Sequence, residues 1–368
     1  GSWYHFDGNQ IAAVLCYFLM LDPQGPQRKG LVLETLVTTK MLGAIVSQAG
    51  GSWIVDDLLV GFKYVADVLN TLDRDGRYRH VTCSSDQLVL AAEESHGIMV
   101  LSSIREKDAT PACMYLAILY QRLRREGKTI LDYYLHLLEQ IGDYADVNRS
   151  IMMVGAAGIL RRDHIMTSLR HSPPEVLAGH VVRKVIDYWD ENVFGTFASE
   201  SDKLSRNIVQ MCTDQYIVTV RPSGTEPKLK LYCQLLPGSE PSSLRGMRLL
   251  DELRGKANSI ACLLYSELLS LIGVSIGHVG LLLPDIVDLD RKCAFEQKTV
   301  PQLREKLSDG SLTHLHELHA WLAGEVSGLI PGVDSLPALK APVAYLCREW
   351  SAELGSTALC RDLRKWAM

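Results

Sequence analysis

Short apolar runs alternate with amphipathic stretches in the first part of the chain. Residues 31–35 and 53–55 are mostly apolar segments of strand length, and residues 40–49 between them have a helical pattern that ends at two glycines. Thr38 or Thr39 can cap that helix. A strand, a helix and a second strand at this spacing predict a parallel α/β layer.

The same layer continues with a second passage from strand to helix. Residues 89–92 are apolar and residues 93–107 have the composition of a long loop. Asp108 can cap the helix that follows, and Pro111 falls in its first turn, where a missing N–H costs little. A further amphipathic helix is predicted over residues 129–141.

The pattern changes from about residue 151. We expect a helix over residues 181–189 and a strand over 216–220, and residues 229–234 alternate between apolar and polar side chains as a half-buried strand does. Two strands around a polar loop predict a smaller α+β domain. Beyond that domain the sequence predicts mostly helices, over residues 244–272, 301–307, 312–323 and 343–354.

A chain of 368 residues is long for one compact unit. The predicted fold is an α/β domain with a mixed or parallel sheet, then a smaller α+β domain, then a mostly helical carboxyl-terminal extension. The predicted boundaries are residues 1–28 for a leading segment, 29–142, 143–274 and 275–368.

Composition and charge narrow the function classes. The net charge of -5 gives no support to nucleic-acid binding, which usually needs a basic patch. The nine cysteines form no C-x-x-C pair and predict free thiols in a reducing, cytoplasmic setting. Residues 261–283 approach the length of a membrane span, but Glu267 and His278 favour a buried amphipathic helix, so no membrane partner is expected.

The loop at residues 221–228, R-P-S-G-T-E-P-K, concentrates groups suited to phosphate. Arg221 offers a planar fork of donors, and Ser223 and Thr225 add hydroxyls. Gly224 lets the backbone N–H come close to a ligand. A surface turn between two strands is the alternative, but few such turns combine these residues, so the phosphate interpretation is favoured.

With the K-L-Y strand after it, this loop resembles the fourth-domain signature of the α-D-phosphohexomutase superfamily. In that family the loop holds the phosphate of the bound sugar. The match assigns this role to Arg221, Ser223, Gly224, Thr225 and Lys228.

Residues 93–97, E-E-S-H-G, resemble the family's sugar-recognition loop in domain 3. The match implies that Glu93 and Ser95 face the sugar and that Gly97 lets the loop turn tightly. An acidic surface loop is the alternative for this segment alone. The E-E-S form is similar to that of phosphoglucomutases rather than to the E-M-S form of many phosphomannomutases, which favours glucose.

Two further segments resemble the family. In I-R-E-K-D at residues 104–108, the match makes Lys107 a candidate general acid/base and Arg105 a substrate contact, with a solvated charge cluster as the alternative. Gly61 and Lys63 belong to a G-F-K segment similar to one that closes over the substrate. Many relatives have threonine before that glycine, and this chain has valine.

The resemblance covers about residues 3–234, and implies that residues 1–28 end domain 2, 29–142 form domain 3 and 143–274 form domain 4. In the family, a phosphoserine in domain 1 phosphorylates the sugar through glucose 1,6-bisphosphate, and a D-x-D-x-D-R loop in domain 2 holds Mg²⁺. Neither motif occurs in this sequence, so we expect the chain alone to bind a hexose phosphate without turning it over.

Two interpretations of the function stay open. The chain is part of a phosphoglucomutase that interconverts glucose 1-phosphate and glucose 6-phosphate, with a phosphomannomutase as the nearest variant, or it is a non-catalytic phosphosugar-binding module. In the second case residues 275–368 mediate assembly; the oligomeric state is open in both. The H-L-H-E-L-H run at residues 314–319 is interpreted as an exposed helix face rather than a metal site.

Overall fold

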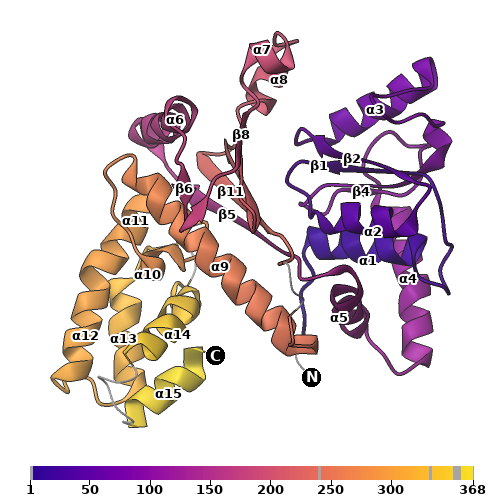
Figure 1. Ribbon diagram of the computed structural model, residues 1–368. Coiled ribbons are helices and arrows are strands. Elements are labelled where there is room, and N and C mark those ends of the chain that lie inside the picture. Colours follow the sequence, from indigo (N-terminus) through magenta and orange to yellow (C-terminus); the bar gives the residue numbers. More distant parts are fainter. Residues whose placement is uncertain (1–2, 239–241, 331–333, 351–357, 368) are drawn as a thin grey trace.

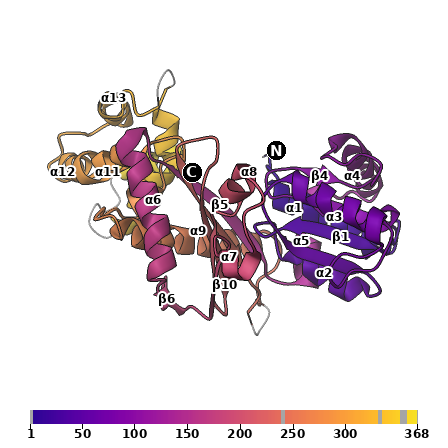
Figure 2. The same cartoon turned by 90° about the horizontal axis from the view of Figure 1, so that it is seen from above.

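The computed structural model describes residues 3–238, 242–330, 334–350 and 358–367 (Figure 1). These residues form two larger β-sheets, a separate two-stranded hairpin and a carboxyl-terminal block of helices. Seen from above, the first sheet and its helices lie on one side of the second sheet, and α6, α9 and the last helices lie on the other (Figure 2). The predicted fold class, an α/β domain followed by an α+β domain and a helical extension, is confirmed.

The first sheet is mixed, with the strand order β2-β1-β3-β4. The first three strands are parallel, and β4 runs antiparallel to β3. All five residues of β1 are buried, as expected for a central parallel strand covered on both faces. The predicted strands are confirmed, and β2 extends three residues further than expected. The strands are β1 Leu31–Thr35, β2 Trp53–Leu58, β3 Leu88–Ala92 and β4 Ile98–Met99.

Helices cover both faces of this sheet. Val32 of β1 packs toward α1, α2, α4 and α5, whereas Leu31 and Leu33 pack toward α3, because successive side chains of a strand point to opposite faces. The helices are α1 Gly8–Met20, α2 Met41–Ala49, α3 Phe62–Asp75, α4 Ala109–Arg125 and α5 Ile130–Ile141, with a 3-10 turn at Ser85–Gln87.

The predicted helix caps are borne out for α4 and in part for α2. The Asp108 side chain accepts a hydrogen bond from the Thr110 N–H at 3.0 Å and caps α4 as expected. The residue directly before α2 is Lys40, which provides no side-chain cap, but the Thr39 hydroxyl accepts a hydrogen bond from the Met41 N–H at 3.4 Å, so Thr39 binds the first turn and Thr38 does not. The Thr38 hydroxyl instead lies 2.9 Å from that of Thr35.

The second sheet is antiparallel, with the order β5-β11-β10-β9-β8. The helix predicted over residues 181–189 is wrong, because Gly179 turns the chain with φ of 80° and the β-branched residues after it favour strands. The strands are β5 Ala145–Met152, β8 Lys184–Asp187, β9 Val209–Cys212, β10 Tyr216–Pro222 and β11 Lys228–Leu235, beside a hairpin of β6 Val176–Leu177 and β7 His180–Val181.

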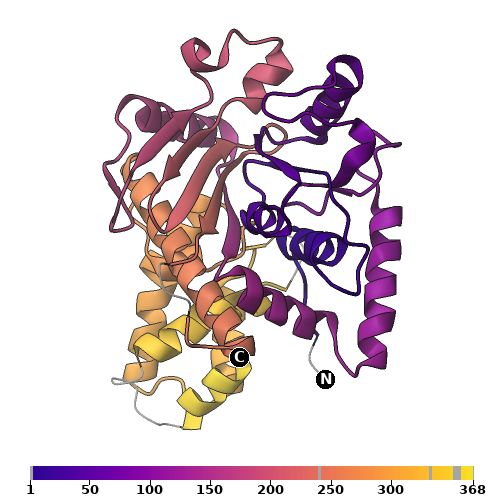
Figure 3. The same cartoon turned by 45° about the vertical axis from the view of Figure 1, so that its right-hand side comes forward.

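Helices pack on the face of the second sheet that is turned away from the first sheet, and a helical excursion joins β8 to β9. In Figure 3 this excursion reaches across the top of the molecule toward α3. The helices on the face are α6 Gly155–His171 and α9 Gly246–Ser270, and those of the excursion are α7 Glu191–Phe194 and α8 Glu200–Ser205.

The carboxyl-terminal helices surround an apolar core of their own, against which Trp321, Trp350 and Trp366 pack. The single helix predicted over residues 261–283 is wrong, because α9 ends at Ser270 and the chain turns at Gly273 with φ of 71°. Of the predicted helix 343–354, residues 351–354 lie outside the described residues. The helices are α10 His278–Leu281, α11 Leu289–Ala294, α12 Val300–Ser308, α13 Leu315–Glu325, α14 Lys340–Glu349 and α15 Ala358–Ala367, with short turns at Phe295–Thr299 and Leu336–Leu339.

No helix within the described ranges has the length and apolarity that crossing a membrane requires. The nine cysteines are free thiols, as the sequence predicts.

The segment before α11 closes the outer edge of the second sheet. The Asp285 carboxylate accepts hydrogen bonds from the Ser150 N–H at 2.6 Å and from Arg149 Nε at 3.2 Å, both on β5. Asp288 then forms a parallel bridge with Met152. The backbone groups of an edge strand need such partners, so the extension protects the free edge of β5.

Replacing Asp285 with asparagine is expected to lower the free energy of unfolding by about 1–2 kcal/mol, because a carboxylate that accepts charge-assisted hydrogen bonds is lost. Urea denaturation followed by circular dichroism measures the change. Asp290→Asn is the matched control, because its exposed ion pair with Arg161 should contribute less than about 0.5 kcal/mol. Equal effects of the two substitutions would contradict the anchoring role of Asp285.

Candidate functional site

The predicted sugar loop, residues 93–97, is the turn between β3 and β4. The Glu93 N–H donates to the Gly97 carbonyl at 2.9 Å, and the loop buries Glu93 while Ser95 is exposed. The residue with positive φ is His96, at 70°, rather than Gly97. Gly97 is needed for another reason: a Cβ there would lie 2.3 Å from Glu93 Oε1, so glycine makes room for the Glu93 carboxylate.

Lys107 and Glu93 come together although fourteen positions separate them. The Lys107 ammonium lies 3.2 Å from Glu93 Oε1 and 5.7 Å from the centre of the Phe62 ring. Arg105 does not join them: its guanidinium forms an ion pair with Asp73 of α3. Two of the charged residues predicted for the sugar site are therefore neighbours, and the third is held by a different partner.

The predicted closing segment, Gly61 and Lys63, starts α3. Gly61 has φ of 128°, a conformation that glycine tolerates. Lys63 Nζ donates to Ser201 Oγ at 2.9 Å, and the Tyr64 hydroxyl lies 3.4 Å from Asp202 Oδ1, so both side chains contact α8. These contacts tie the α7–α8 excursion to the first sheet's domain, and they engage the Lys63 ammonium with α8.

The predicted phosphate loop forms the tip of the hairpin between β10 and β11. The Ser223 N–H donates to the Lys228 carbonyl at 2.8 Å and closes the loop, and Ser223 is buried while Gly224 and Thr225 are exposed. Lys228 Nζ lies 2.9 Å from Glu226 Oε1. The ammonium of Lys228 is therefore balanced within its own loop.

Arg221 ends the other side of this hairpin and is half-buried. Its Nε donates to the Tyr232 hydroxyl at 3.3 Å. Lys230 is its direct partner in the β10–β11 register, so the two cationic side chains leave the sheet on the same face. Lys230 was not among the residues predicted for the site; the alternation along its strand together with the hairpin register would have placed it beside Arg221.

The sugar loop carries a second glutamate, Glu94, which is buried. Burial raises the pKa of Glu94, and the positive charges of Arg221 and Lys230 act against that rise. Burial and the neighbouring Arg221 lower the pKa of Lys230. Burial also raises the pKa of Tyr232 to about 12. The charges of the phosphate hairpin therefore act on an acid of the sugar loop.

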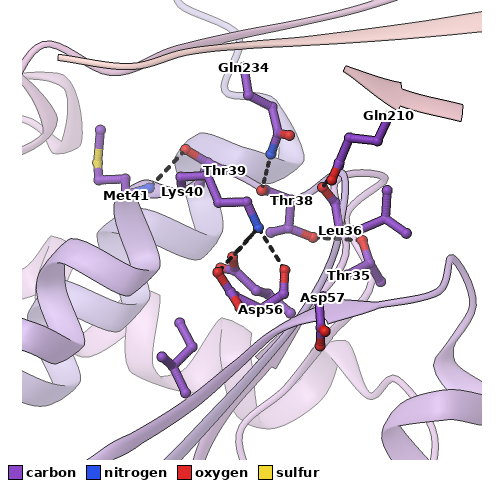
Figure 4. Close-up of polar contacts among 12 residues, drawn as sticks. Thr35, Leu36, Thr38, Thr39, Lys40, Met41, Asp56, Asp57, Gln210 and Gln234 are labelled. Carbon is purple, nitrogen blue, oxygen red and sulfur yellow. Dashed lines mark hydrogen bonds and ion pairs between the residues drawn. The ribbon is translucent and has the colours of Figure 1, made fainter. Parts of the chain in front are cut away.

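A buried polar cluster joins the two sheets (Figure 4). Gln234 of β11 donates to the Thr38 carbonyl, and Gln210 of β9 donates to the Leu36 carbonyl at 3.5 Å. Both glutamines therefore reach the segment that follows β1. This contact fixes where the phosphate hairpin lies relative to the sugar loop.

Lys40 is the cation of this cluster. Its Nζ donates to Glu34 Oε1 at 3.0 Å and to the Asp56 carbonyl at 2.6 Å (Figure 4). Glu34 is fully buried, and its second carboxylate oxygen has no hydrogen-bond partner among the described residues. Burial raises the pKa of Glu34 to about 8, against the effect of Lys40.

Replacing Glu34 with glutamine tests this buried carboxyl through pH. The raised pKa means that the folded chain binds the proton more tightly than the unfolded chain, whose glutamate titrates near ~4.3. The contribution of protonated Glu34 to the free energy of unfolding is fully present below about pH 4. This contribution is lost as the pH rises toward 8, by at most ~1.4 kcal/mol per pH unit. The unfolding free energy of the variant relative to wild type should therefore rise between about pH 5 and pH 8 in urea denaturation. A constant or falling difference would contradict the raised pKa.

The histidine run near residue 316 starts α13. The N–H groups of Thr313 and His314 donate to Glu317 Oε2, both at 3.0 Å, and the His319 ring packs 4.7 Å from that of Trp366. The run therefore serves helix capping and packing. Within the ranges that the structure describes, no three His, Cys, Asp or Glu residues are grouped so as to hold a metal ion.

Comparisons with known proteins find phosphoglucomutases among the similar sequences. The family model described as phosphoglucomutase/phosphomannomutase, alpha/beta/alpha domain III, matches residues 7–141. A phosphoglucomutase of Staphylococcus aureus (strain MRSA252) is 27% identical over 238 residues, which cover 64% of this chain and 41% of that protein. The phosphoglucomutase of strain N315 is 26% identical over the same length. The chain spans about two fifths of the length of these curated relatives.

Solved structures of similar proteins include the open form of the Paramecium exocytosis-sensitive phosphoprotein pp63/parafusin, a phosphoglucomutase. It has a TM-score of 0.46 and 15% identity, over 74% of this chain and 43% of that chain. A phosphoglucomutase/phosphomannomutase family protein from Burkholderia thailandensis has a TM-score of 0.34 and 12% identity, over 69% of this chain and 42% of that one.

Residues 7–141 thus match an α/β/α domain of the phosphoglucomutase/phosphomannomutase type. Together with the similarity to phosphoglucomutases, this match supports the resemblance to the carboxyl-terminal half of the α-D-phosphohexomutase superfamily that the motifs indicate. The matched domain begins at residue 7 and includes α1. The predicted boundaries at residues 28, 142 and 274 stay predictions.

Proposed function

We propose that this chain binds a hexose phosphate between its two loops, as part of a phosphoglucomutase that interconverts glucose 1-phosphate and glucose 6-phosphate. The observation that carries the proposal is the contact between the two sheets: Gln234 of β11 and Gln210 of β9 bind the segment after β1, which supports a position of the phosphate hairpin beside the sheet that carries the sugar loop. One end of a small ligand can then contact the phosphate loop while its hydroxyls contact the sugar loop.

The phosphate is held, in this proposal, at the tip of the β10–β11 hairpin. Arg221 supplies a planar fork of donors for two phosphate oxygens, and Lys230 adds a second cation on the same face. The exposed backbone of Gly224 and the hydroxyls of Ser223 and Thr225 complete the set of donors. Lys228 contributes less than the sequence predicts, since Glu226 already balances its charge.

The sugar hydroxyls are held, in this proposal, by Glu93, Ser95 and Lys107. A hydroxyl that binds between Glu93 and Lys107 contacts a carboxylate acceptor and an ammonium group that lie 3.2 Å apart. Such a pair can accept the proton of a sugar hydroxyl and return it, which is the work of a general acid/base. Arg105 acts through its ion pair with Asp73 rather than by touching the sugar.

Mg²⁺, glucose 1,6-bisphosphate and a phosphoserine belong to the proposal for the family enzyme as a whole. The described residues offer no group of three metal-binding side chains, so they do not fit a Mg²⁺ site and no step here depends on the ion. The chain's own residues bind and orient the sugar phosphate. A cytoplasmic location is part of the same proposal.

Calorimetric titration tests the proposal by comparing glucose 6-phosphate, mannose 6-phosphate, glucose and inorganic phosphate as ligands of the 368-residue chain. The proposal requires that glucose 6-phosphate binds more tightly than inorganic phosphate or glucose alone, because both loops then contribute. Tighter binding of mannose 6-phosphate would favour the phosphomannomutase variant. Equal binding of glucose 6-phosphate and inorganic phosphate would contradict the role of the sugar loop.

A further inference from the structure

The segment that carries Lys107 has no regular structure of its own. Residues 100–108 connect β4 to α4 and form neither helix nor strand. The Lys107 side chain is 52% exposed, although its ammonium lies 3.2 Å from Glu93 Oε1. A lysine that is half in solvent keeps many rotamers, and one ion pair at the surface restrains it only weakly. The position of the Lys107 ammonium therefore depends on what holds the backbone around it.

The backbone is anchored on both sides of Lys107. After it, Asp108 caps α4 and so belongs to a regular helix end. Before it, the Arg105 guanidinium forms an ion pair with Asp73 of α3 and donates to Ser85 Oγ at 3.3 Å. The planar guanidinium holds its partners in a fixed geometry, and Asp73 is the charged one of the two. Asp73 therefore supplies the stronger contact of the anchor that precedes Lys107.

Helix α3 contacts this segment near both of its own ends. Phe62, the first residue of the helix, is buried, and the centre of its ring lies 5.7 Å from Lys107 Nζ, which is close enough for a cation–π attraction. Asp73 lies near the end of the same helix, about 16 Å further along at 1.5 Å per residue. The Arg105 and Lys107 side chains therefore reach toward opposite ends of one helix, and α3 supports the segment like a splint.

We propose that Asp73 is a positioning residue, which holds the segment against α3 through Arg105 and so sets Lys107 beside Glu93. The inference rests on the proposed function, in which Lys107 and Glu93 bind a sugar hydroxyl, and it adds a residue that does not touch the sugar. Without the Asp73 carboxylate, Arg105 loses its ion pair and keeps its contact with the neutral Ser85 hydroxyl. The segment must then be ordered when the sugar binds, and that ordering lowers affinity. The loss falls on the sugar end of the ligand, because the phosphate loop belongs to the second sheet.

The first part of the test follows Lys107 itself and needs no ligand. Methylation of the lysines with isotope-labelled formaldehyde gives each one an NMR signal, and Lys107→Arg identifies the signal of Lys107. We expect Asp73→Asn to move that signal toward those of fully exposed lysines, away from the influence of the Phe62 ring, and Asp73→Glu to restore at least half of the shift. Asp75→Asn is the matched control, because it removes the same charge from the same helix, where Asp75 pairs with the exposed Arg74. It should leave the Lys107 signal in place.

The second part is calorimetric titration of glucose 6-phosphate and of inorganic phosphate into the full chain. We expect Asp73→Asn to bind glucose 6-phosphate about three- to tenfold more weakly than wild type or Asp75→Asn does, and inorganic phosphate equally well. An unmoved Lys107 signal, or an unchanged affinity for glucose 6-phosphate, in a folded Asp73→Asn chain would overturn the positioning role while leaving the proposed function standing.

The two failures can be told apart. If wild type binds glucose 6-phosphate no more tightly than inorganic phosphate, the proposed function fails, and the Lys107 signal alone decides whether Asp73 positions this side chain. Should Asp73→Asn not fold, Arg105→Gln breaks the same ion pair from the other side. Arg105→Gln must then move the Lys107 signal in the same direction, and an unmoved signal would refute the inference.

Discussion

Replacing Arg221 with alanine is expected to weaken the binding of glucose 6-phosphate by about 30-fold or more. Removing one partner of a hydrogen-bonded charge pair costs ~2–5 kcal/mol, and each ~1.4 kcal/mol is a factor of ten in the dissociation constant. Arg221 is half-buried and Tyr232 fixes its Nε, so its remaining donors are oriented before the phosphate arrives. Isothermal titration calorimetry measures the change directly.

Two further variants separate charge from geometry at this position. Arg221→Lys keeps the positive charge but loses the planar fork, so it should recover only part of the affinity. Arg183→Ala removes an exposed arginine that is paired with Asp214 beside the same sheet, and it should bind as wild type does. Wild-type affinity in Arg221→Ala would contradict the placement of the phosphate.

The second prediction with a large expected effect is that this chain has no mutase activity of its own. The 368-residue chain is expected to convert glucose 1-phosphate to glucose 6-phosphate no faster than a blank, even with added Mg²⁺ and glucose 1,6-bisphosphate. The residues that we propose for the site would bind phosphate and exchange protons, and none of them is a phosphoryl donor. A coupled assay that follows glucose 6-phosphate measures the rate, with a full-length phosphoglucomutase as the positive control.

Turnover that rises in proportion to the concentration of the chain would contradict this expectation. Lys107→Ala distinguishes a true activity from a contaminant, because only an activity of this chain would be lost with its candidate acid/base. A contaminating enzyme would leave the rate unchanged in that variant.

The sequence was sufficient for the parallel sheet but not for the strands near residue 185. Continuous apolar runs such as residues 31–35 predict buried strands, and Asp108 before an amphipathic run predicts a capped helix; both are confirmed. Residues 181–189 look helical because apolar side chains recur at intervals. Pairing of β8 with β9 outweighs that local pattern.

At the candidate site, too, the sequence motifs identify individual residues but not the contacts between residues that lie far apart in the chain. Motifs placed Glu93, Lys107 and Arg221 in candidate loops, and the structure brings Glu93 and Lys107 to 3.2 Å of each other. The motifs did not single out Lys230, although the hairpin register pairs it with Arg221, and they did not single out Glu94, whose burial depends on how the chain folds around its loop. They also could not foresee that Asp73 would hold Arg105, since α3 supplies that partner from a distant part of the chain.

A crystal structure of the chain with glucose 6-phosphate tests the placement of the ligand most directly. We expect the phosphate within hydrogen-bonding distance of Arg221 and of the Ser223–Thr225 segment, and the sugar hydroxyls facing Glu93 and Ser95. A phosphate bound elsewhere, or a sugar that does not touch the loop at residues 93–97, would contradict this placement.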